Sequence, residues 1–197
     1  LEAAQRKCGV IGTVSYGTGQ ADVEASRTTP EASEIHRLLR EMRDSGCRAG
    51  VMEVSSIGLV MHRVAGVQFD VGVFTNLSQD HLDFHKTMED YYQAKKLLVT
   101  HLENQSSDKK PVMVVNLDDT AGERLTKTSY DYVTFATYGM GVRCDFKASN
   151  IKTDFSGTTF QLDAKGRQFL VRMPLIGRFN IYNALAALTA VSHMGLN

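Results

Sequence analysis

The chain has 197 residues, of which 43% are hydrophobic, so it is long enough to bury the core of one large domain. Lysine plus arginine and aspartate plus glutamate number 22 each, which gives a formal net charge of zero. This balance argues against a general nucleic-acid or membrane-surface binder, because both need a basic excess to neutralise phosphates. No apolar run approaches the roughly 20 residues that span a bilayer, so we expect no membrane insertion.

The three cysteines lie far apart, at positions 8, 47 and 144, without a Cys-x-x-Cys pair. This spacing argues against a disulfide framework or a zinc site and fits a reducing, cytoplasmic location. The first residues carry no signal-peptide pattern. Segment 1–5 instead has the composition of the end of a helix, which predicts that a piece upstream has been removed.

Strands and helices are predicted to alternate over the first two thirds of the chain. Apolar, strand-like runs lie at 9–14, 49–54, 69–75 and 111–115, and the third of them is expected to be fully buried. A helical pattern follows each of these runs, ending near 45, 63, 102 and 127, whereas the polar segment 16–27 is expected to be a loop. This alternation indicates βαβ units around a parallel sheet.

The first of these helices has the clearest start and face. Thr29 is expected to cap it, because Pro30 suits the first helical position and Glu31 meets the positive end of the helix dipole. Four apolar residues then fall on one face: Ile35, Leu38, Leu39 and Met42. The pair Ser45-Gly46 is expected to end the helix.

The sequence pattern changes between residues 132 and 173, where the alternation of strands and helices stops. Short β-rich runs at 158–162 and 168–172 are separated by turn signals such as Ser156-Gly157 and Lys165-Gly166, which predicts antiparallel hairpins. A final helix is expected at about 180–193. The predicted fold class is therefore α/β, with a mostly parallel Rossmann-like sheet flanked by helices and a small antiparallel β insertion at 132–173.

Polar side chains gather where three predicted strands end. Ligands of open parallel sheets bind beyond these carboxyl ends, so each cluster is a candidate site. The clusters are Glu53 with Ser55-Ser56, then Asn76 leading to Asp80, His81, Asp83 and His85, then Asn116 with Asp118-Asp119. A carboxylate and an imidazole on adjacent strand ends suit a Mg²⁺ ion whose other ligands are waters and phosphates.

Each of these residues also has an ordinary interpretation. Asp80 and Asp83 suit helix caps, and His81 with His85, four residues apart, suit a zinc site that would need a third ligand. Lys95 and Arg63, taken singly, are typical surface charges.

Taken together and in order, the segments closely resemble the Mur ligases, and within them the MurE type. Six of them agree in order and spacing: Thr28-Thr29-Pro30, Met52-Glu-Val-Ser-Ser56, His62-Arg-Val64, Phe74-Thr-Asn-Leu77, Asp80-His-Leu-Asp83 and Ala94-Lys95. Two later segments match the same domain: Asn116-Leu-Asp-Asp119 and Gly177-Arg-Phe-Asn180-Ile-Tyr-Asn183. The resemblance implies that residues 1–197 form a central, ATP-binding domain.

The resemblance also implies roles for individual residues. Glu53 and His81 match the residues that hold the catalytic Mg²⁺, and Lys95 matches a lysine that CO₂ converts to a carbamate, N-carboxylysine. Positions matching contacts to the UDP-muramoyl dipeptide are Thr28, Thr29, Ser55 and Arg63. Asn180 and Asn183 match a pair near the nucleotide base, and Asn116 and Asp118 are placed near the nucleotide.

The implied reaction joins a diamino acid to UDP-N-acetylmuramoyl-L-alanyl-D-glutamate. ATP phosphorylates the side-chain carboxylate of D-glutamate, and the amine of diaminopimelate, or of lysine, then displaces phosphate. Metal ions offset the charge of the two anions that approach each other.

Two departures from the family pattern are evident. A Gly-x-x-Gly-Lys-Thr phosphate loop is absent, as is a carboxyl-terminal ligase domain, so we expect a fragment that cannot catalyse ligation alone. The second departure is Ile57, which stands where MurE-type enzymes usually have histidine.

Three other interpretations stay open from the sequence. One is a different branch of the same ligases, of the MurD, MurF, folylpolyglutamate synthetase or cyanophycin synthetase type. Another is a nucleotide-binding or assembly module without catalysis. The last is a metal hydrolase that uses Asp80, His81, Asp83 and His85.

Overall fold

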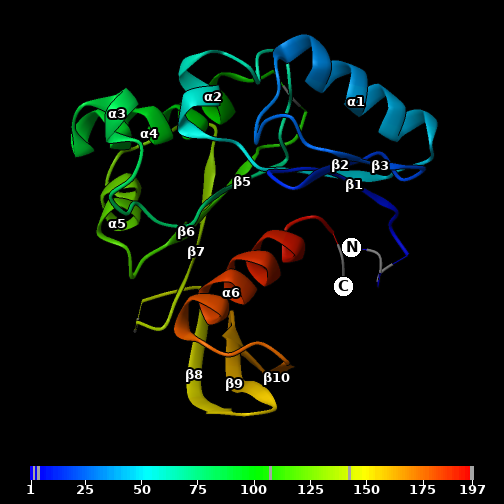
Figure 1. Ribbon diagram of the computed structural model, residues 1–197. Helices are drawn as coiled ribbons and strands as arrows, with labels where there is room; N and C mark the ends of the chain where they lie inside the picture. Colours follow the sequence, from blue (N-terminus) through cyan, green and yellow to red (C-terminus); the bar gives the residue numbers. More distant parts are fainter. Residues whose placement is uncertain (2, 4, 107, 142, 196–197) are drawn as a thin grey trace. The chain divides into compact units, whose positions relative to one another are not determined.

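The computed structural model describes residues 1, 3, 5–106, 108–141 and 143–195. These divide into two compact units (Figure 1): the first comprises Leu1–Val67 and Asp80–Leu98, and the second comprises Gln68–Gln79 and Val99–Asn197. The predicted helix end at 1–5 includes positions 2 and 4, which lie outside the described residues.

The first unit contains a four-stranded sheet with the order β3-β2-β1-β4. Its strands are β1 (Cys8–Ile11), β2 (Ser15–Gly17), β3 (Asp22–Glu24) and β4 (Ala49–Met52). β1 pairs parallel with β4 and antiparallel with β2, and β2 pairs antiparallel with β3. The prediction of a loop at 16–27 is therefore wrong, because three-residue strands are too short to show an alternating apolar pattern.

Helix α1 (Ala32–Asp44) packs its apolar face on this sheet (Figure 1). Leu38 and Met42 are buried against Ile11 of β1 and Tyr16 of β2. The predicted cap is wrong: the residue before the helix is Glu31, and the Thr29 hydroxyl is used elsewhere. The predicted end is confirmed, since Ser45 caps the helix and Gly46 has a φ of 80°.

Three further helices follow the sheet in sequence. They are α2 (Ser56–Val60), α3 (Leu82–His85) and α4 (Met88–Asn104). Helix α4 begins in the first unit, and its last turns belong to the second.

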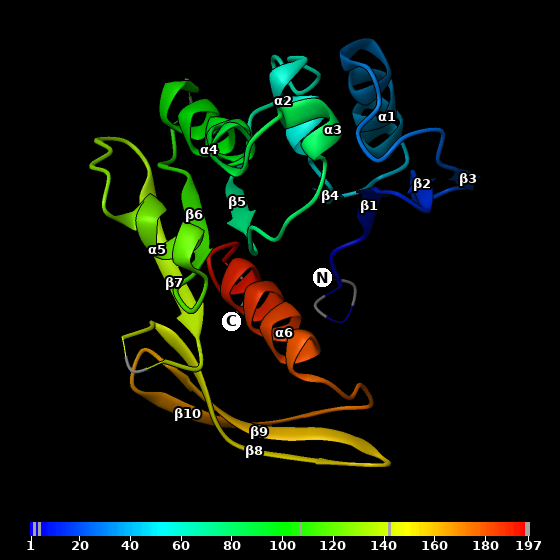
Figure 2. The same cartoon turned by 60° about the vertical axis from the view of Figure 1, so that its left-hand side comes forward.

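The second unit is built on a six-stranded sheet with the order β10-β9-β8-β7-β6-β5 (Figure 2). Its strands are β5 (Val71–Phe74), β6 (Val112–Asn116), β7 (Thr134–Gly139), β8 (Phe146–Asp154), β9 (Gly157–Ala164) and β10 (Arg167–Met173). β5 to β8 are parallel, and β8 to β10 are antiparallel. Antiparallel pairing thus begins at β8, and β7 belongs to the parallel part. β5 alternates between buried and half-buried residues and is not buried throughout as expected.

Helices α5 (Thr120–Thr126) and α6 (Arg178–Ser192) complete the second unit. Leu185 of α6 packs with Val114 of β6, Tyr138 of β7 and Phe160 of β9 in one core. The predicted α/β class, with mostly parallel strands, flanking helices and antiparallel strands toward the carboxyl end, is confirmed. No helix in the described part of the chain is long and apolar enough to cross a membrane.

Candidate functional site

Glu53 lies directly after β4 with one carboxylate oxygen engaged. The backbone N–H of Thr13 donates to Oε2 over 3.1 Å, and the Thr13 hydroxyl donates to the same oxygen over 2.7 Å. The backbone N–H of Glu53 donates to Ile11, which fixes this strand end. Among the residues that the structure describes, none hydrogen-bonds to Oε1. Thr13 was not identified from the sequence, because its partner lies 40 residues away.

Thr29 connects the segment before α1 to the end of β4. Its hydroxyl donates to the backbone oxygen of Glu53 over 3.0 Å and accepts from the backbone N–H of Ser55 over 2.9 Å. The residue is only 1% exposed. Its neighbour Thr28 is half-buried, and its hydroxyl lies 3.1 Å from that of Thr13. The structure therefore brings Thr28, Thr29 and Ser55 to the same strand end as Glu53.

Ser55 and Arg63 bracket helix α2. The Ser55 hydroxyl accepts from the backbone N–H of Gly58 and so caps the helix. The Arg63 guanidinium donates to the backbone oxygen of Thr29 over 3.0 Å and pairs with Glu31 over 3.0 Å. Its side chain is 15% exposed, so the interpretation of a surface charge does not hold. Ile57 lies in α2 and is half-buried.

His81 and His85 have different surroundings, although they lie one helical turn apart. His81 precedes α3 in a left-handed conformation with a φ of 52°, and its imidazole is 44% exposed beside Asp80. His85 is 5% exposed, and its Nε2 lies 2.7 Å from the Ser56 hydroxyl. Burial, with the neighbouring His81, lowers the pKa of His85. Because Nε2 of His85 is engaged with Ser56, the arrangement differs from that of two histidines facing one zinc ion.

The predicted caps of α3 are wrong. His81 is the residue before the helix, and no side chain among the described residues caps it; Asp80 lies one position earlier and accepts from the backbone N–H of His81 over 2.8 Å, whereas Asp83 lies within the helix.

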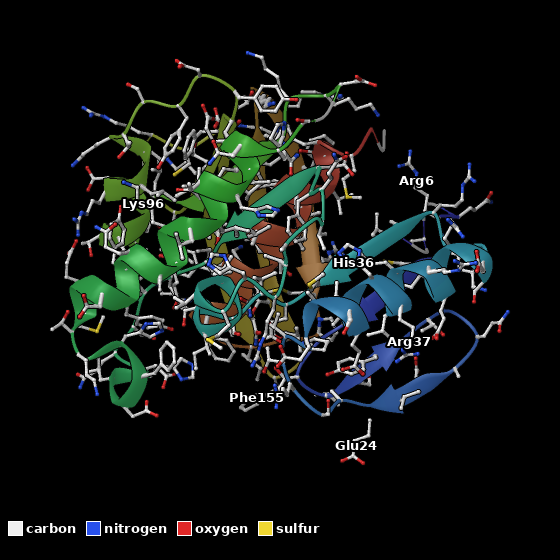
Figure 3. The ribbon with its side chains drawn as sticks, turned by 90° about the horizontal axis from the view of Figure 1, so that it is seen from above. Arg6, Glu24, His36, Arg37, Lys96 and Phe155 are labelled. Atoms are coloured by element: carbon white, nitrogen blue, oxygen red, sulfur yellow. The ribbon has the colours of Figure 1, made fainter. Side chains whose placement is uncertain are left out.

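Tyr91 of α4 brings His81 and Lys95 to one aromatic ring. The His81 ring meets it edge-on with centroids 5.9 Å apart, and His85 stacks on it at 5.0 Å. The Lys95 ammonium lies 5.2 Å from the ring centroid. Figure 3 locates this part of α4 through the adjacent Lys96. Tyr91 was missed from the sequence, although its spacing of four residues from Lys95 places both on one helix face.

The donor set of the first unit fits a hard divalent cation that keeps most of its own waters. Glu53 offers one carboxylate oxygen to which no described residue hydrogen-bonds, and His81 offers an exposed imidazole. Mg²⁺ is typically held by one or two carboxylates with waters and phosphates completing six ligands. The described residues contain no cluster of three or more His, Cys, Asp and Glu that could hold a metal.

Asp118 is the centre of a network in the second unit. Its carboxylate accepts from the backbone N–H of Met140 at 2.6 Å and of Gly141 at 3.1 Å, and from the Tyr182 hydroxyl at 3.0 Å. The backbone N–H of Asp118 donates to the side chain of Asn116 over 3.0 Å. These contacts join the end of β6 to the segment after β7 and to α6. Tyr182 was not identified from the sequence, because its contact spans 64 residues.

Asn180 and Asn183 lie on α6 on either side of Tyr182. The Asn180 side chain donates to the backbone oxygen of Ile176 over 2.9 Å, which holds the start of the helix. Asn183 is exposed. Through the bond between Tyr182 and Asp118, the helix that carries both asparagines is tied to the end of β6, where Asn116 lies.

Comparison with known proteins gives consistent matches over the whole chain. The model of the Mur ligase middle domain matches residues 1–191. The chain is 41% identical to UDP-N-acetylmuramoyl-L-alanyl-D-glutamate–2,6-diaminopimelate ligase of Clostridium tetani, covering 100% of this chain and 39% of that protein. It is 41% identical to the ligase of the same name from Bacillus cereus, covering 96% of this chain and 38% of that protein.

Solved structures agree in fold. A structure of a ligase with that same name superposes with a TM-score of 0.85 at 29% identity, covering 100% of this chain and 39% of the other. MurF from Acinetobacter baumannii superposes with a TM-score of 0.74 at 20% identity, covering 99% and 38%, which shows the shared fold alone. The chain spans about two fifths of the length of these relatives. The match to residues 1–191 and the identity to the ligases show that the chain belongs to the Mur ligase middle domain family.

Proposed function

We propose that this chain is the ATP-binding central domain of a cytoplasmic peptidoglycan ligase of the MurE type. The ligase would join meso-diaminopimelate, or L-lysine, to UDP-N-acetylmuramoyl-L-alanyl-D-glutamate. The observation that carries the proposal is the 41% identity over all 197 residues to a ligase named for this reaction. The three cysteines are free thiols, which fits a reducing compartment.

The proposed metal site consists of Glu53 and His81, with Lys95 as a carbamate. The amine of Lys95 would add to CO₂ with loss of a proton, which turns a cation into an anion able to ligate or orient a second Mg²⁺. Support comes from Glu53 Oε1, which accepts no hydrogen bond from the residues that the structure describes, and from Tyr91, which holds His81 and Lys95 against one ring. When bound, Mg²⁺ would offset the charge of the ATP phosphates and of the substrate carboxylate.

The proposed contacts to the UDP-muramoyl dipeptide come from the end of β4 and the end of α2. Thr28 and Ser55 would offer polar contacts, and Arg63 would offer a cation held in place by Thr29 and Glu31. Thr29 would shape this surface from beneath, because its hydroxyl already makes two internal bonds. The nucleotide would be held by Asn180 and Asn183, with Asn116 and Asp118 nearby.

A chimeric enzyme tests the proposal. The segment of the Clostridium tetani ligase that matches residues 1–197 is replaced by this chain, and ADP release and the UDP-muramoyl tripeptide are measured with diaminopimelate or lysine. We expect product with one of the two diamino acids, and a loss of at least a hundredfold in the Glu53→Gln variant. A folded chimera that binds ADP and the UDP-dipeptide yet ligates neither diamino acid would contradict the proposed activity.

A further inference from the structure

The Glu53 carboxylate is oriented by one residue that precedes it by 40 positions. Thr13 follows β1 and Glu53 follows β4, and these strands pair in parallel with Ile11 opposite Met52. The backbone and the hydroxyl of Thr13 both donate to Oε2, at 3.1 Å and 2.7 Å. Two donors on one oxygen restrict the rotation of the carboxylate, and the other oxygen keeps its lone pairs for a ligand.

The protons of the threonine hydroxyls determine the direction of the next hydrogen bond. A carboxylate only accepts, so the Thr13 hydroxyl uses its single proton on Glu53. The Thr28 hydroxyl lies 3.1 Å from that of Thr13 and must therefore donate to it. Thr28 is left with lone pairs only, so it can accept from a ligand N–H or O–H but cannot donate to a phosphate or carboxylate oxygen.

We propose that Thr13 is a positioning residue that links cation binding at Glu53 to ligand binding at Thr28. A ligand N–H or O–H donated to Thr28 polarises both hydroxyls and strengthens the bond that holds Glu53. The effect is reciprocal, because a coupling free energy acts equally on both ligands. The inference rests on the proposed function, in which Glu53 binds a divalent cation and Thr28 contacts the UDP-dipeptide.

The first test measures Mn²⁺ binding to the 197-residue chain by electron paramagnetic resonance. Thr13→Val keeps the backbone donor and removes the hydroxyl, and we expect it to weaken Mn²⁺ binding about tenfold. Thr13→Ser restores the hydroxyl and is expected to bind within about twofold of the wild type. Thr134→Val, an exposed strand position in the second unit, serves as the matched control, and thermal unfolding verifies that every variant folds.

The second test measures UDP-N-acetylmuramoyl-L-alanyl-D-glutamate binding by calorimetry with and without Mn²⁺. We expect Mn²⁺ to tighten binding to the wild type and to have no such effect on Thr13→Val.

The outcomes separate the two levels of the hypothesis. If Glu53→Gln binds Mn²⁺ as tightly as the wild type, the proposed metal role of Glu53 fails and the inference fails with it. If Glu53→Gln weakens Mn²⁺ binding while Thr13→Val equals the wild type, or Thr13→Ser loses as much as Thr13→Val, only the positioning role of Thr13 is overturned.

Discussion

Replacing Thr29 with valine tests how the end of β4 is held. Valine has the shape of threonine but cannot hydrogen-bond, so the backbone oxygen of Glu53 and the backbone N–H of Ser55 lose their partner. Leaving a buried polar group unsatisfied costs about 1–3 kcal/mol. Both of these bonds are only part-buried, so we expect Thr29→Val to lower the free energy of unfolding by about 1–3 kcal/mol in total.

Thr29→Ser is the matched control, because it keeps the hydroxyl and removes only the methyl group. That methyl group packs closely against Gly58, where an added Cβ would lie 2.8 Å from it. Its loss is expected to cost about 1 kcal/mol.

Urea unfolding followed by far-ultraviolet circular dichroism measures both variants, since the chain has no tryptophan. Amide hydrogen exchange at Ser55 should accelerate in Thr29→Val and not in Thr29→Ser. If the valine variant is no less stable than the serine variant, the internal role of the Thr29 hydroxyl is refuted.

Three further predictions concern the second unit. The Glu103 carboxylate accepts from three consecutive backbone N–H groups at 131–133; burial raises its pKa, but these bonds prevail and hold it below the ordinary 4.5. The ionised Glu103 carboxylate therefore stabilises the fold above pH 4.5, and this stabilisation is lost as the pH falls through the lowered pKa. The difference in urea midpoint between wild type and Glu103→Gln should shrink on acidification from pH 7 to 3.5. A constant difference would contradict this prediction. Gly122→Ala would place a Cβ 2.1 Å from the backbone oxygen of Asn116, so urea unfolding should show a free energy of unfolding lower by about 1–3 kcal/mol or more. Gly50→Ala is the control. Its Cβ would meet its nearest neighbour at 3.6 Å, and its free energy of unfolding should stay within about 0.5 kcal/mol of the wild type. Burial raises the pKa of Cys144 to about 11, so iodoacetamide at pH 8 should label it more slowly in the folded chain than in the urea-unfolded chain, as peptide mass mapping would show.

The sequence predicted the elements whose pattern is local and long. Helix α1 was recognised because Ile35, Leu38 and Met42 repeat at helical spacing, and all three are buried. The hairpin of β2 and β3 was missed, because strands of three residues with exposed side chains at Asp22–Glu24 show no period. The parallel pairing of β7 was also missed, since strand direction depends on partners far along the chain.

The local sequence pattern predicted the candidate site only at the ends of strands, whereas the roles of Thr28, Arg63 and Lys95 came from the resemblance to the Mur ligases. Glu53 was identified because it follows an apolar run, and ligands gather where parallel strands end. Thr13, Tyr91 and Tyr182 were missed, because nothing in their local sequence shows that they contact Glu53, His81 and Asp118. The capping role assigned to Thr29 was wrong for the same reason: its partners lie at the end of β4, 24 and 26 residues away.

The most direct test of the proposed metal site is a crystal structure of the chain soaked with Mn²⁺, with the ion located by its anomalous scattering. The account predicts a peak about 2.1 Å from Glu53 Oε1 and beside the His81 imidazole, with waters completing its ligands. It also predicts that Thr13 keeps both hydrogen bonds to Oε2 in that crystal. A peak held by Asp80, Asp83 or His85 while the Glu53 carboxylate stays without a metal would contradict the account.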